Sequence, residues 1–337
     1  MSNQEEILAK RALIVIGVVS LLIFVIGIIL LALGLNFAFY IGDSSIQSIF
    51  KVITFTGEAI FFIILVAIFY IVYDKKFAKN LAFSLMFSVY LNEMLKNVSQ
   101  DPRPPANYDP SEEYGFIEPG YGFPSGHSQN AVATWGYMAY EFKDETEPSF
   151  IIPLFLSILI FFIAISRVII GVHDLQDIIG GLLIGIGFLI AFIYLEPIVS
   201  KKIDPLSLKV KLLLVIIVAV ALFVIGTLLF PTTGLGLVKN AEPYSDAGGF
   251  AQIGGVILGL GIGYLLENEY IDYQPSELNT KQKILNLIIG IVILLVCYVI
   301  FEALIHGNVL LRFIRYGALS FILSFLAPLI FTKINRK

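Results

Sequence analysis

Charged residues are scarce in this sequence: Asp, Glu, Lys and Arg make up only 14% of its 337 residues. Hydrophobic residues make up 58%, and the mean hydropathy is +0.88. About a quarter of the residues in a soluble domain are charged, so this composition excludes a soluble globular protein. The formal net charge of -4 is small and argues against a nucleic-acid partner. The single cysteine, Cys297, lies in an apolar run, which excludes a disulfide framework and a thiolate metal site.

Long apolar runs fill most of the chain instead. A helix of about 20 apolar residues crosses a bilayer, and continuous rather than alternating runs favour helices. We therefore predict an all-α, polytopic transmembrane helix bundle of about ten spans. No small-residue cleavage site closes the first run, so we expect a retained helix there rather than a signal peptide. The expected spans are residues 12–35, 52–73, 78–96, 127–141, 149–166, 174–196, 211–230, 249–267, 283–305 and 309–332.

The distribution of lysine and arginine predicts the orientation of these spans. With ten spans, 15 of these residues fall on the side of the two termini and 7 on the other side. Cytoplasmic loops are the richer in positive charge, so we expect cytoplasmic termini. The long loop over residues 97–124 then faces the outside or a lumen.

Three polar segments occur at span ends on that outward side. They are "KNVSQDPRPP" (Lys96 to Pro105), "GFPSGHSQNA" (Gly122 to Ala131) and "SRVIIGVHDLQDIIGG" (Ser166 to Gly181). Ionisable residues at the edge of the hydrocarbon region are costly and usually mark function. Because all three segments lie on one side, we expect them to converge into one pocket.

The residue types in these segments suit a bound oxyanion. Lys96, Arg103 and Arg167 provide three cations. Arginine binds phosphate with two parallel hydrogen bonds, and lysine acts as a point charge. Ser125 is typical of a helix N-cap, and the N–H groups near Gly126 would then point at an anion. Taken singly, each cation could equally be a snorkelling residue at a helix end.

The histidines could add a nucleophile and an acid to this predicted oxyanion site. Two of the three, His127 and His173, fall inside the polar segments, whereas His306 lies outside them and is expected to be structural. His173 and Asp177 are four residues apart and share a helix face, but Asp174 diverges from His173. A carboxylate on one imidazole nitrogen fixes the tautomer and leaves the other nitrogen as a nucleophile. His127 could then protonate the leaving oxygen.

These residues resemble, in order and spacing, the three motifs of the type 2 phosphatidic acid phosphatase superfamily. The matching patterns are Lys96–x6–Arg103–Pro104, Pro124–Ser125–Gly126–His127 and Ser166–Arg167–x5–His173–x3–Asp177. The resemblance implies that His173 forms a phosphohistidine, that Asp177 orients it and that His127 is the general acid. It also implies no metal or other cofactor. The phosphate binders that it implies are Lys96, Arg103, Ser125, Gly126 and Arg167.

The C-terminal part is similar to the sphingosine phosphate phosphatase branch of that superfamily. "SDAGGFAQIGGVILG" and "RFIRYGALSFILSFLAP" have the character of that branch, although many of its eukaryotic members carry Thr where this chain has Gly126. We therefore expect a six-helix phosphatase core over residues 1–200 and additional transmembrane helices over residues 201–337. Three roles stay open for the additional helices: a substrate pocket, a homodimer interface or a second function.

The expected function is dephosphorylation of a membrane lipid phosphate. Candidate substrates are phosphatidic acid, phosphatidylglycerol phosphate, a sphingoid base phosphate or a polyprenyl diphosphate. A lipid phosphotransferase would use the same phosphohistidine and is the first alternative. A transporter is a weaker alternative, because the charges gather on one face rather than along a path across the bilayer. Glu58 and Glu302 lie near span ends, where snorkelling explains them as well as substrate contact does.

Overall fold

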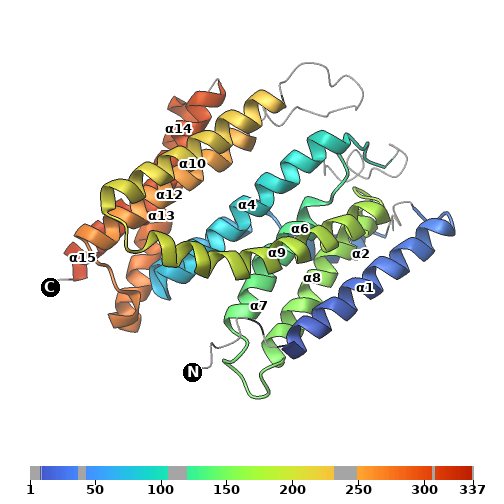
Figure 1. Ribbon diagram of the computed structural model, residues 1–337. Helices are drawn as coiled ribbons and strands as arrows, with labels where there is room; N and C mark the ends of the chain where they lie inside the picture. Colours follow the sequence, from blue (N-terminus) through green and yellow to red (C-terminus); the bar gives the residue numbers. More distant parts are fainter. Residues whose placement is uncertain are drawn as a thin grey trace. The chain divides into compact units, whose positions relative to one another are not determined.

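The computed structural model contains helices joined by turns and loops, and no strand, in the residues that it describes, which are residue 8 and residues 10–36, 43–104, 120–230, 249–305 and 308–335 (Figure 1). His306 lies outside these residues, as does most of the predicted long loop. The helices are α1 (Lys10–Ala32), α2 (Ser44–Phe55), α3 (Ala59–Val72), α4 (Lys75–Ser99), α6 (Gly126–Ala131), the π-helical turn η1 (Val132–Gly136), α7 (Tyr137–Glu141), α8 (Ile151–Ile170), α9 (Leu175–Ile203), α10 (Leu208–Leu229), α12 (Gly249–Tyr270), the 3-10 turn η2 (Pro275–Glu277), α13 (Thr280–Leu304), α14 (Val309–Phe321), the π-helical turn η3 (Ile322–Leu326) and α15 (Ala327–Asn335).

The all-α, multi-pass architecture is confirmed. Seven helices of the described residues are long and apolar enough to cross a membrane, or eight if α2 and α3 together form one broken span. All ten predicted spans correspond to helix or to runs of helices. One was wrong in detail, because 52–73 is interrupted between α2 and α3. The break between α2 and α3 falls at Thr56, Gly57 and Glu58, where two polar residues and a glycine interrupt the apolar run. The helices over 127–141 and 309–332 each contain a π-helical turn, and Val309–Asn335 is long and apolar enough to cross a membrane.

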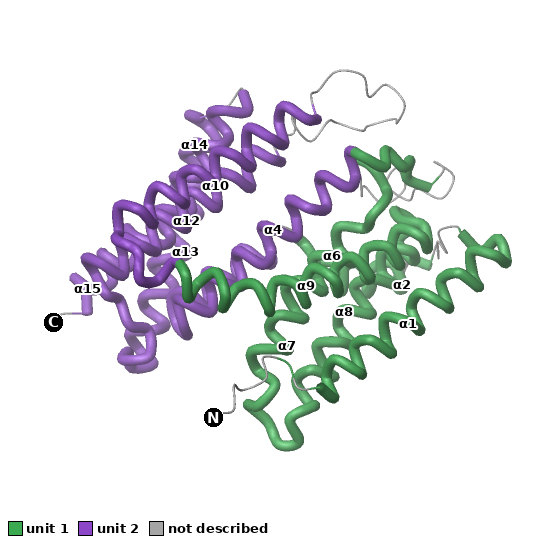
Figure 2. Tube along the Cα trace, viewed as in Figure 1, with its two compact units in different colours: residues 1–58, 98–202 green, residues 59–97, 203–337 purple. Residues whose placement is uncertain are grey.

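The chain divides into two compact units that interleave along the sequence (Figure 2). The first unit comprises residues 1–58 and 98–202, and the second comprises residues 59–97 and 203–337. Residues 59–97 thus group with the C-terminal helices, whereas the sequence analysis assigned them to the N-terminal core.

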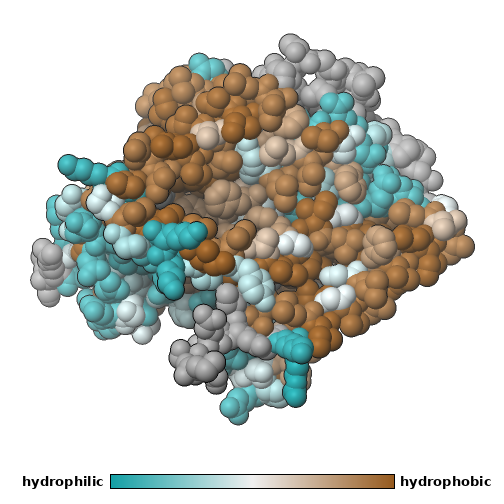
Figure 3. All heavy atoms as spheres, in the orientation of Figure 1, coloured by the Kyte–Doolittle hydropathy of each residue, from teal (hydrophilic) through white to brown (hydrophobic). Residues whose placement is uncertain are grey.

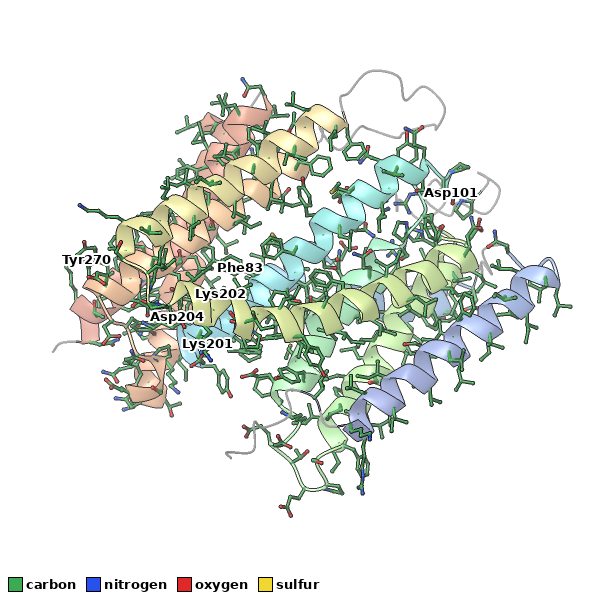
Figure 4. All side chains as sticks on the ribbon, in the orientation of Figure 1. Phe83, Asp101, Lys201, Lys202, Asp204 and Tyr270 are labelled. Atoms are coloured by element: carbon green, nitrogen blue, oxygen red, sulfur yellow. The ribbon has the colours of Figure 1, made fainter. Side chains whose placement is uncertain are left out.

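The first unit is built on α8, which α2, α6 and η1 contact. Its core contains Ala164 and Val168 of α8 together with Leu175 and Ile178 of α9. α1 contributes Leu30 to this core, and its Gly27 is the only buried residue of that helix. A Cβ at Gly27 would lie 2.9 Å from Cδ1 of Ile179, so glycine allows α1 to approach α9 closely. Lys201 and Lys202 lie in the last turn of α9, which ends at Ile203 (Figure 4).

The second unit is built on α12, which contacts α10 and α14. Glycines at positions 254, 255 and 259 of α12 bring these helices together at backbone distance. α4 joins the same unit through Tyr90, whose ring lies 5.3 Å from that of Phe250. A second core forms around Ile71, Tyr273 and Phe331.

A buried ion pair links α4 and α12 inside this second unit. Nζ of Lys75 lies 2.7 Å from Oε2 of Glu267, and Oε1 of Glu267 accepts a hydrogen bond from the N–H of Tyr273 at 2.6 Å. The side chain of Glu267 is fully buried and that of Lys75 is 8% exposed. A buried charge is tolerated only when it is paired and hydrogen-bonded, so this carboxylate depends on Lys75.

Apolar side chains cover much of the surface of both units. Figure 3 shows hydrophobic residues along α1 in the first unit and along α10 in the second, with hydrophilic residues gathered near helix ends. Only 6% of the apolar 18-residue segment of α1 is buried, and only 11% of the corresponding segment of α10. Helices that are apolar all round require lipid or protein on every side, which identifies an integral membrane protein.

Candidate active site

The loop between α8 and α9 sets the position of His173. α8 ends where Gly171 takes a positive φ of 91°, a conformation that favours glycine. The N–H groups of residues 171 and 172 then bond to carbonyl oxygens in the last turn of α8. Because α9 begins at residue 175, residues 171–174 alone connect the helix that carries Arg167 to the helix that carries Asp177.

His173 is held between a carboxylate and a guanidinium. Its Nδ1 lies 2.9 Å from Oδ2 of Asp177, and its Nε2 lies 3.2 Å from Nη1 of Arg103. A guanidinium can only donate, so we infer that Nε2 accepts and that Nδ1 carries the proton that Asp177 accepts. Oδ2 of Asp177 also accepts a hydrogen bond from the N–H of Asp174 at 3.2 Å. Asp174 thus helps to hold Asp177 through its backbone rather than contacting His173 through its carboxyl.

Arg103 is fixed by two backbone carbonyl groups. Its Nε donates to the carbonyl oxygen of Gly120 at 3.1 Å, and its Nη1 donates to that of Val172 at 3.0 Å. Gly120 has a positive φ of 82°. An anion brought to Nε2 of His173 would therefore meet this guanidinium.

Arg167 lies in the last turn of α8 and is fully buried. Its Nη1 donates a hydrogen bond to Oγ1 of Thr54 at 2.6 Å. A buried guanidinium is expensive unless its N–H groups are paired, so Thr54 is part of its support. Thr54 belongs to α2, which none of the three motifs includes.

Ser125 is the N-cap of the short helix α6, as its residue type predicted. Its Oγ lies 3.4 Å from the N–H of Ser128, and its N–H donates to the carbonyl oxygen of Asp177 at 2.9 Å. The backbone thus joins the PSGH segment directly to the segment that carries the histidine–aspartate pair. A Cβ at Gly181 would lie 2.6 Å from the carbonyl oxygen of Ser125, so α9 must be glycine here. Gly126 is the first residue of α6.

His127 follows in the first turn of α6 and contacts a carboxylate. Its Nε2 lies 3.1 Å from Oε1 of Glu58, with the histidine side chain 12% exposed and the glutamate side chain 33% exposed. The sequence analysis left Glu58 open between a snorkelling residue at a span end and a substrate contact. The sequence contains no pattern that relates position 58 to position 127, so only the folded structure reveals this contact.

Lys96 belongs to the second unit. It lies in the last turn of α4 and is 3% exposed. Asn92 and Glu93, one turn earlier on α4, are also buried. A buried lysine needs polar surroundings, which these neighbours on the same helix begin to provide.

Two further carboxylates are found here: Asp174 lies in the loop between α8 and α9, and Asp101 contacts Gln176 at the start of α9. Gln176 donates from Nε2 to Oδ2 of Asp101 at 3.2 Å, and Asp101 follows the end of α4 (Figure 4). Burial raises the pKa of Asp174 to about 6, and the negative charge of Asp101 adds to the shift. This loop therefore contains a carboxyl group that titrates in the mildly acidic range.

Comparison with known protein families supports the sequence resemblance. The model of the PAP2 superfamily matches residues 77–201, which include all the site residues that the motifs predict. The model of the PAP2 superfamily phosphatase transmembrane extension matches residues 251–337.

Two known proteins are similar to parts of the chain. Lipid phosphate phosphatase delta of Arabidopsis thaliana is 29% identical over 140 residues, which is 38% of this chain and 32% of that protein. The chain thus matches about a third of the length of this curated relative. The crystal structure of a transmembrane PAP2 type phosphatidylglycerolphosphate phosphatase from Bacillus subtilis shares 22% identity, covering 47% of this chain and 79% of that one, with a TM-score of 0.40. The domain match and the extension match follow one another along the sequence, and the chain belongs to the PAP2 superfamily.

Proposed function

We propose that this chain is an integral membrane phosphatase that hydrolyses a lipid phosphate or diphosphate through a phosphohistidine, without a metal or another cofactor. The observation that carries the proposal is the position of His173 between Asp177 and Arg103. Asp177 fixes the proton on Nδ1, and the lone pair of Nε2 faces a cation that can hold a phosphoryl group.

In the first step, Nε2 of His173 attacks the phosphorus atom. The Nε2–P bond forms while the bond from phosphorus to the leaving oxygen breaks, and His127 gives its proton to that oxygen. In the second step, His127 takes a proton from water as the water oxygen attacks phosphorus. The N–P bond then breaks, inorganic phosphate leaves and both histidines regain their starting protonation. Asp177 keeps its hydrogen bond to Nδ1 throughout and stabilises the positive charge that develops on the ring.

The phosphoryl oxygens need positive charge and hydrogen-bond donors during both steps. Arg103 and Arg167 supply fixed guanidinium groups, and the N–H groups at the start of α6 supply donors. We assign phosphate binding to these groups and to Lys96. Side-chain cations then take the part that a metal ion plays in other phosphatases. The residues assigned to phosphate binding are Lys96, Arg103, Ser125, Gly126 and Arg167.

The substrate is proposed to be a lipid because the site residues end or begin apolar helices. A head group could reach them while its tail stays in hydrocarbon. Phosphatidic acid, phosphatidylglycerol phosphate, a sphingoid base phosphate and a polyprenyl diphosphate all fit this chemistry. The similar Arabidopsis protein is a lipid phosphate phosphatase by name.

The direct test is phosphate release from these four lipids by the purified protein in detergent with EDTA. We expect wild-type activity in EDTA, and a loss of about 10³-fold or more in His173→Ala because the nucleophile is gone. His306→Ala is the matched control, since His306 lies outside all three motifs, and it should stay active. Strict metal dependence, or activity in His173→Ala, would refute the mechanism.

The same assay separates hydrolysis from phosphotransfer. A hydrolase releases phosphate in the absence of an acceptor alcohol, because water reaches the intermediate. Release that required an added acceptor would favour the transferase. Orthovanadate should inhibit in either case, because it mimics five-coordinate phosphorus.

We further propose that the site faces the outside or a lumen and that the termini are cytoplasmic. The excess of lysine and arginine on the side of the termini supports this orientation. A cysteine at Tyr108, which lies outside the described residues, should react with an impermeant maleimide in intact cells once Cys297 is replaced by serine. A cysteine at Thr146, between α7 and α8, should react only after permeabilisation. The reverse pattern would invert the topology.

A further inference from the structure

The turn between α2 and α3, "TFTGE" (Thr54 to Glu58), contacts the candidate site although it lies outside all three motifs and outside the matched residues 77–201. Thr54 accepts the hydrogen bond of Arg167, and the carbonyl oxygen of Thr56 accepts one from Nε1 of Trp135 at 3.3 Å. Glu58 contacts His127. One short turn thus meets α8, η1 and α6 within the first unit.

Gly57 lets this turn sit directly against the ring of His127. A Cβ at position 57 would lie 3.0 Å from Cδ2 of His127 and 2.9 Å from Cγ2 of Ile163. Real Cβ atoms are almost never that close to their neighbours. The N–H groups of Gly57 and Glu58 bond back to the end of α2. The backbone of the turn is therefore closed, and the carboxyl of Glu58 is directed by fixed geometry rather than by a flexible loop.

The two histidines of the site meet carboxylates through different nitrogens. Asp177 contacts Nδ1 of His173, whose Nε2 faces Arg103, whereas Glu58 contacts Nε2 of His127. A neighbouring guanidinium disfavours a charged imidazole, and a neighbouring carboxylate favours one. A nucleophile must be neutral and a general acid must be protonated, so different surroundings suit the two roles.

We propose that Glu58 is a positioning residue for His127: it holds the ring against the Gly57 turn and keeps it in the protonated form that can give a proton to the leaving oxygen. This inference rests on the proposed phosphatase function and adds a fourth segment to its site. Glu58 itself exchanges no proton. The proton passes from His127 to the leaving oxygen as the bond from phosphorus to that oxygen breaks.

The leaving group provides a test that a merely structural role would not satisfy. Phosphatidic acid releases an alkoxide, which needs a proton to depart, whereas 4-nitrophenyl phosphate releases a weakly basic phenolate, which does not. kcat/KM reports the steps up to phosphohistidine formation for both. General-acid catalysis contributes about 10²–10⁴-fold, so Glu58→Gln should lower kcat/KM for phosphatidic acid by about 10–100-fold. The loss for 4-nitrophenyl phosphate should stay within about threefold, because that step needs no acid.

Three further single variants and one double variant make the result specific. Thr54→Val, in the last turn of α2, removes one acceptor of Arg167 and should lower kcat/KM for both substrates alike, because the phosphoryl group is common to them. Glu302→Gln changes another span-end glutamate, which pairs with Arg315 in the second unit, and should change neither rate. Glu58→Asp keeps the carboxylate and should restore part of the loss. In a His127→Ala background, Glu58→Gln should have no further effect.

Equal losses on both substrates in Glu58→Gln, with an unchanged melting temperature, would overturn the assignment of Glu58 while leaving the phosphatase intact. An additive loss in the His127→Ala background would do the same. Failure of the wild-type protein to release phosphate from either substrate would overturn the proposed function and this inference with it.

Discussion

The contact between α12 and α14 allows a sharp prediction for Gly259. A Cβ at this position would lie 2.8 Å from the carbonyl carbon of Gly317, and closer still to its oxygen. Ordinary van der Waals contact is 3.4–4 Å. The obstacle is backbone, which has no rotamer to change. Gly259→Ala therefore forces the two helices apart by more than 1 Å along a contact that holds the second unit together.

The magnitude follows from two opposing terms. Forcing an extra carbon into a well-packed interface costs about 1–3 kcal/mol. Alanine is the better helix former and returns about 0.5–1 kcal/mol relative to glycine. Gly259→Ala should thus be destabilised by roughly 1–2 kcal/mol. Gly187, in α9, is the matched control: a Cβ there meets nothing within 4 Å, so Gly187→Ala should gain about 0.5–1 kcal/mol.

Both variants can be followed by heating the detergent-solubilised protein and measuring the fraction that still elutes as a folded species. The midpoint should fall for Gly259→Ala and rise for Gly187→Ala. The same substitution, glycine to alanine, should thus shift the midpoint in opposite directions at the two positions, and this difference tests the prediction. A Gly259→Ala protein as heat-resistant as wild type would refute the close approach of α12 and α14.

Other predictions concern the carboxylates. Asp177→Asn should lower kcat by about 10³–10⁴-fold with little change in KM, because the amide no longer holds the proton on Nδ1 of His173; a loss under tenfold in steady-state assays would contradict that role. Lys75→Met should destabilise the protein by about 3–5 kcal/mol because it leaves Glu267 buried and unpaired, and Lys75→Met/Glu267→Gln should recover most of this in the same heating assay. Asp174→Asn should raise the melting temperature above pH 6, because ionising this carboxyl opposes folding when its pKa is raised from 3.8 to about 6. That gain should vanish below about pH 3, where the carboxyl is protonated in both states, and a gain independent of pH would argue against it.

The features of the fold that depend on local sequence were predictable. Helices lie at all ten expected positions, and seven or eight of the described helices are long and apolar enough to cross a membrane, because a span must satisfy its backbone within itself. The contact of His173 with Asp177 follows from a spacing of four residues at a helix start. Ser125 caps α6, as expected of serine before a helical run.

Features that depend on distant residues were not predictable. Glu58 and His127 are separated by 69 positions, and Thr54 and Arg167 by 113. A threonine or glutamate at the end of an apolar run has many ordinary explanations, so neither carries a signal of its own. The roles assigned to the motif residues came from family resemblance, and those roles stay predictions.

The roles of individual glycines also could not be predicted from the sequence. Those at 180, 181 and 185 of α9 each face a neighbour that a Cβ would meet at 3.0 Å or less. Gly187, in the same "IIGGLLIGIG" run, faces open space. The sequence cannot tell these positions apart, because the difference lies in what stands opposite each one.

The interleaving of the two units has a consequence for biosynthesis. Residues 59–97 are made early, yet the partners of Lys75, Tyr90 and Tyr70 in their own unit are Glu267, Phe250 and the carbonyl oxygen of Ser324. When the ribosome has synthesised the last motif residue, Asp177, the helices that pack against α3 and α4 have not yet been translated. A chain stopped after residue 202 would contain every motif residue, but α3 and α4 would lack these partners. The C-terminal helices are therefore needed for α3 and α4 to complete their packing, and the second unit can fold only when the whole chain has been made.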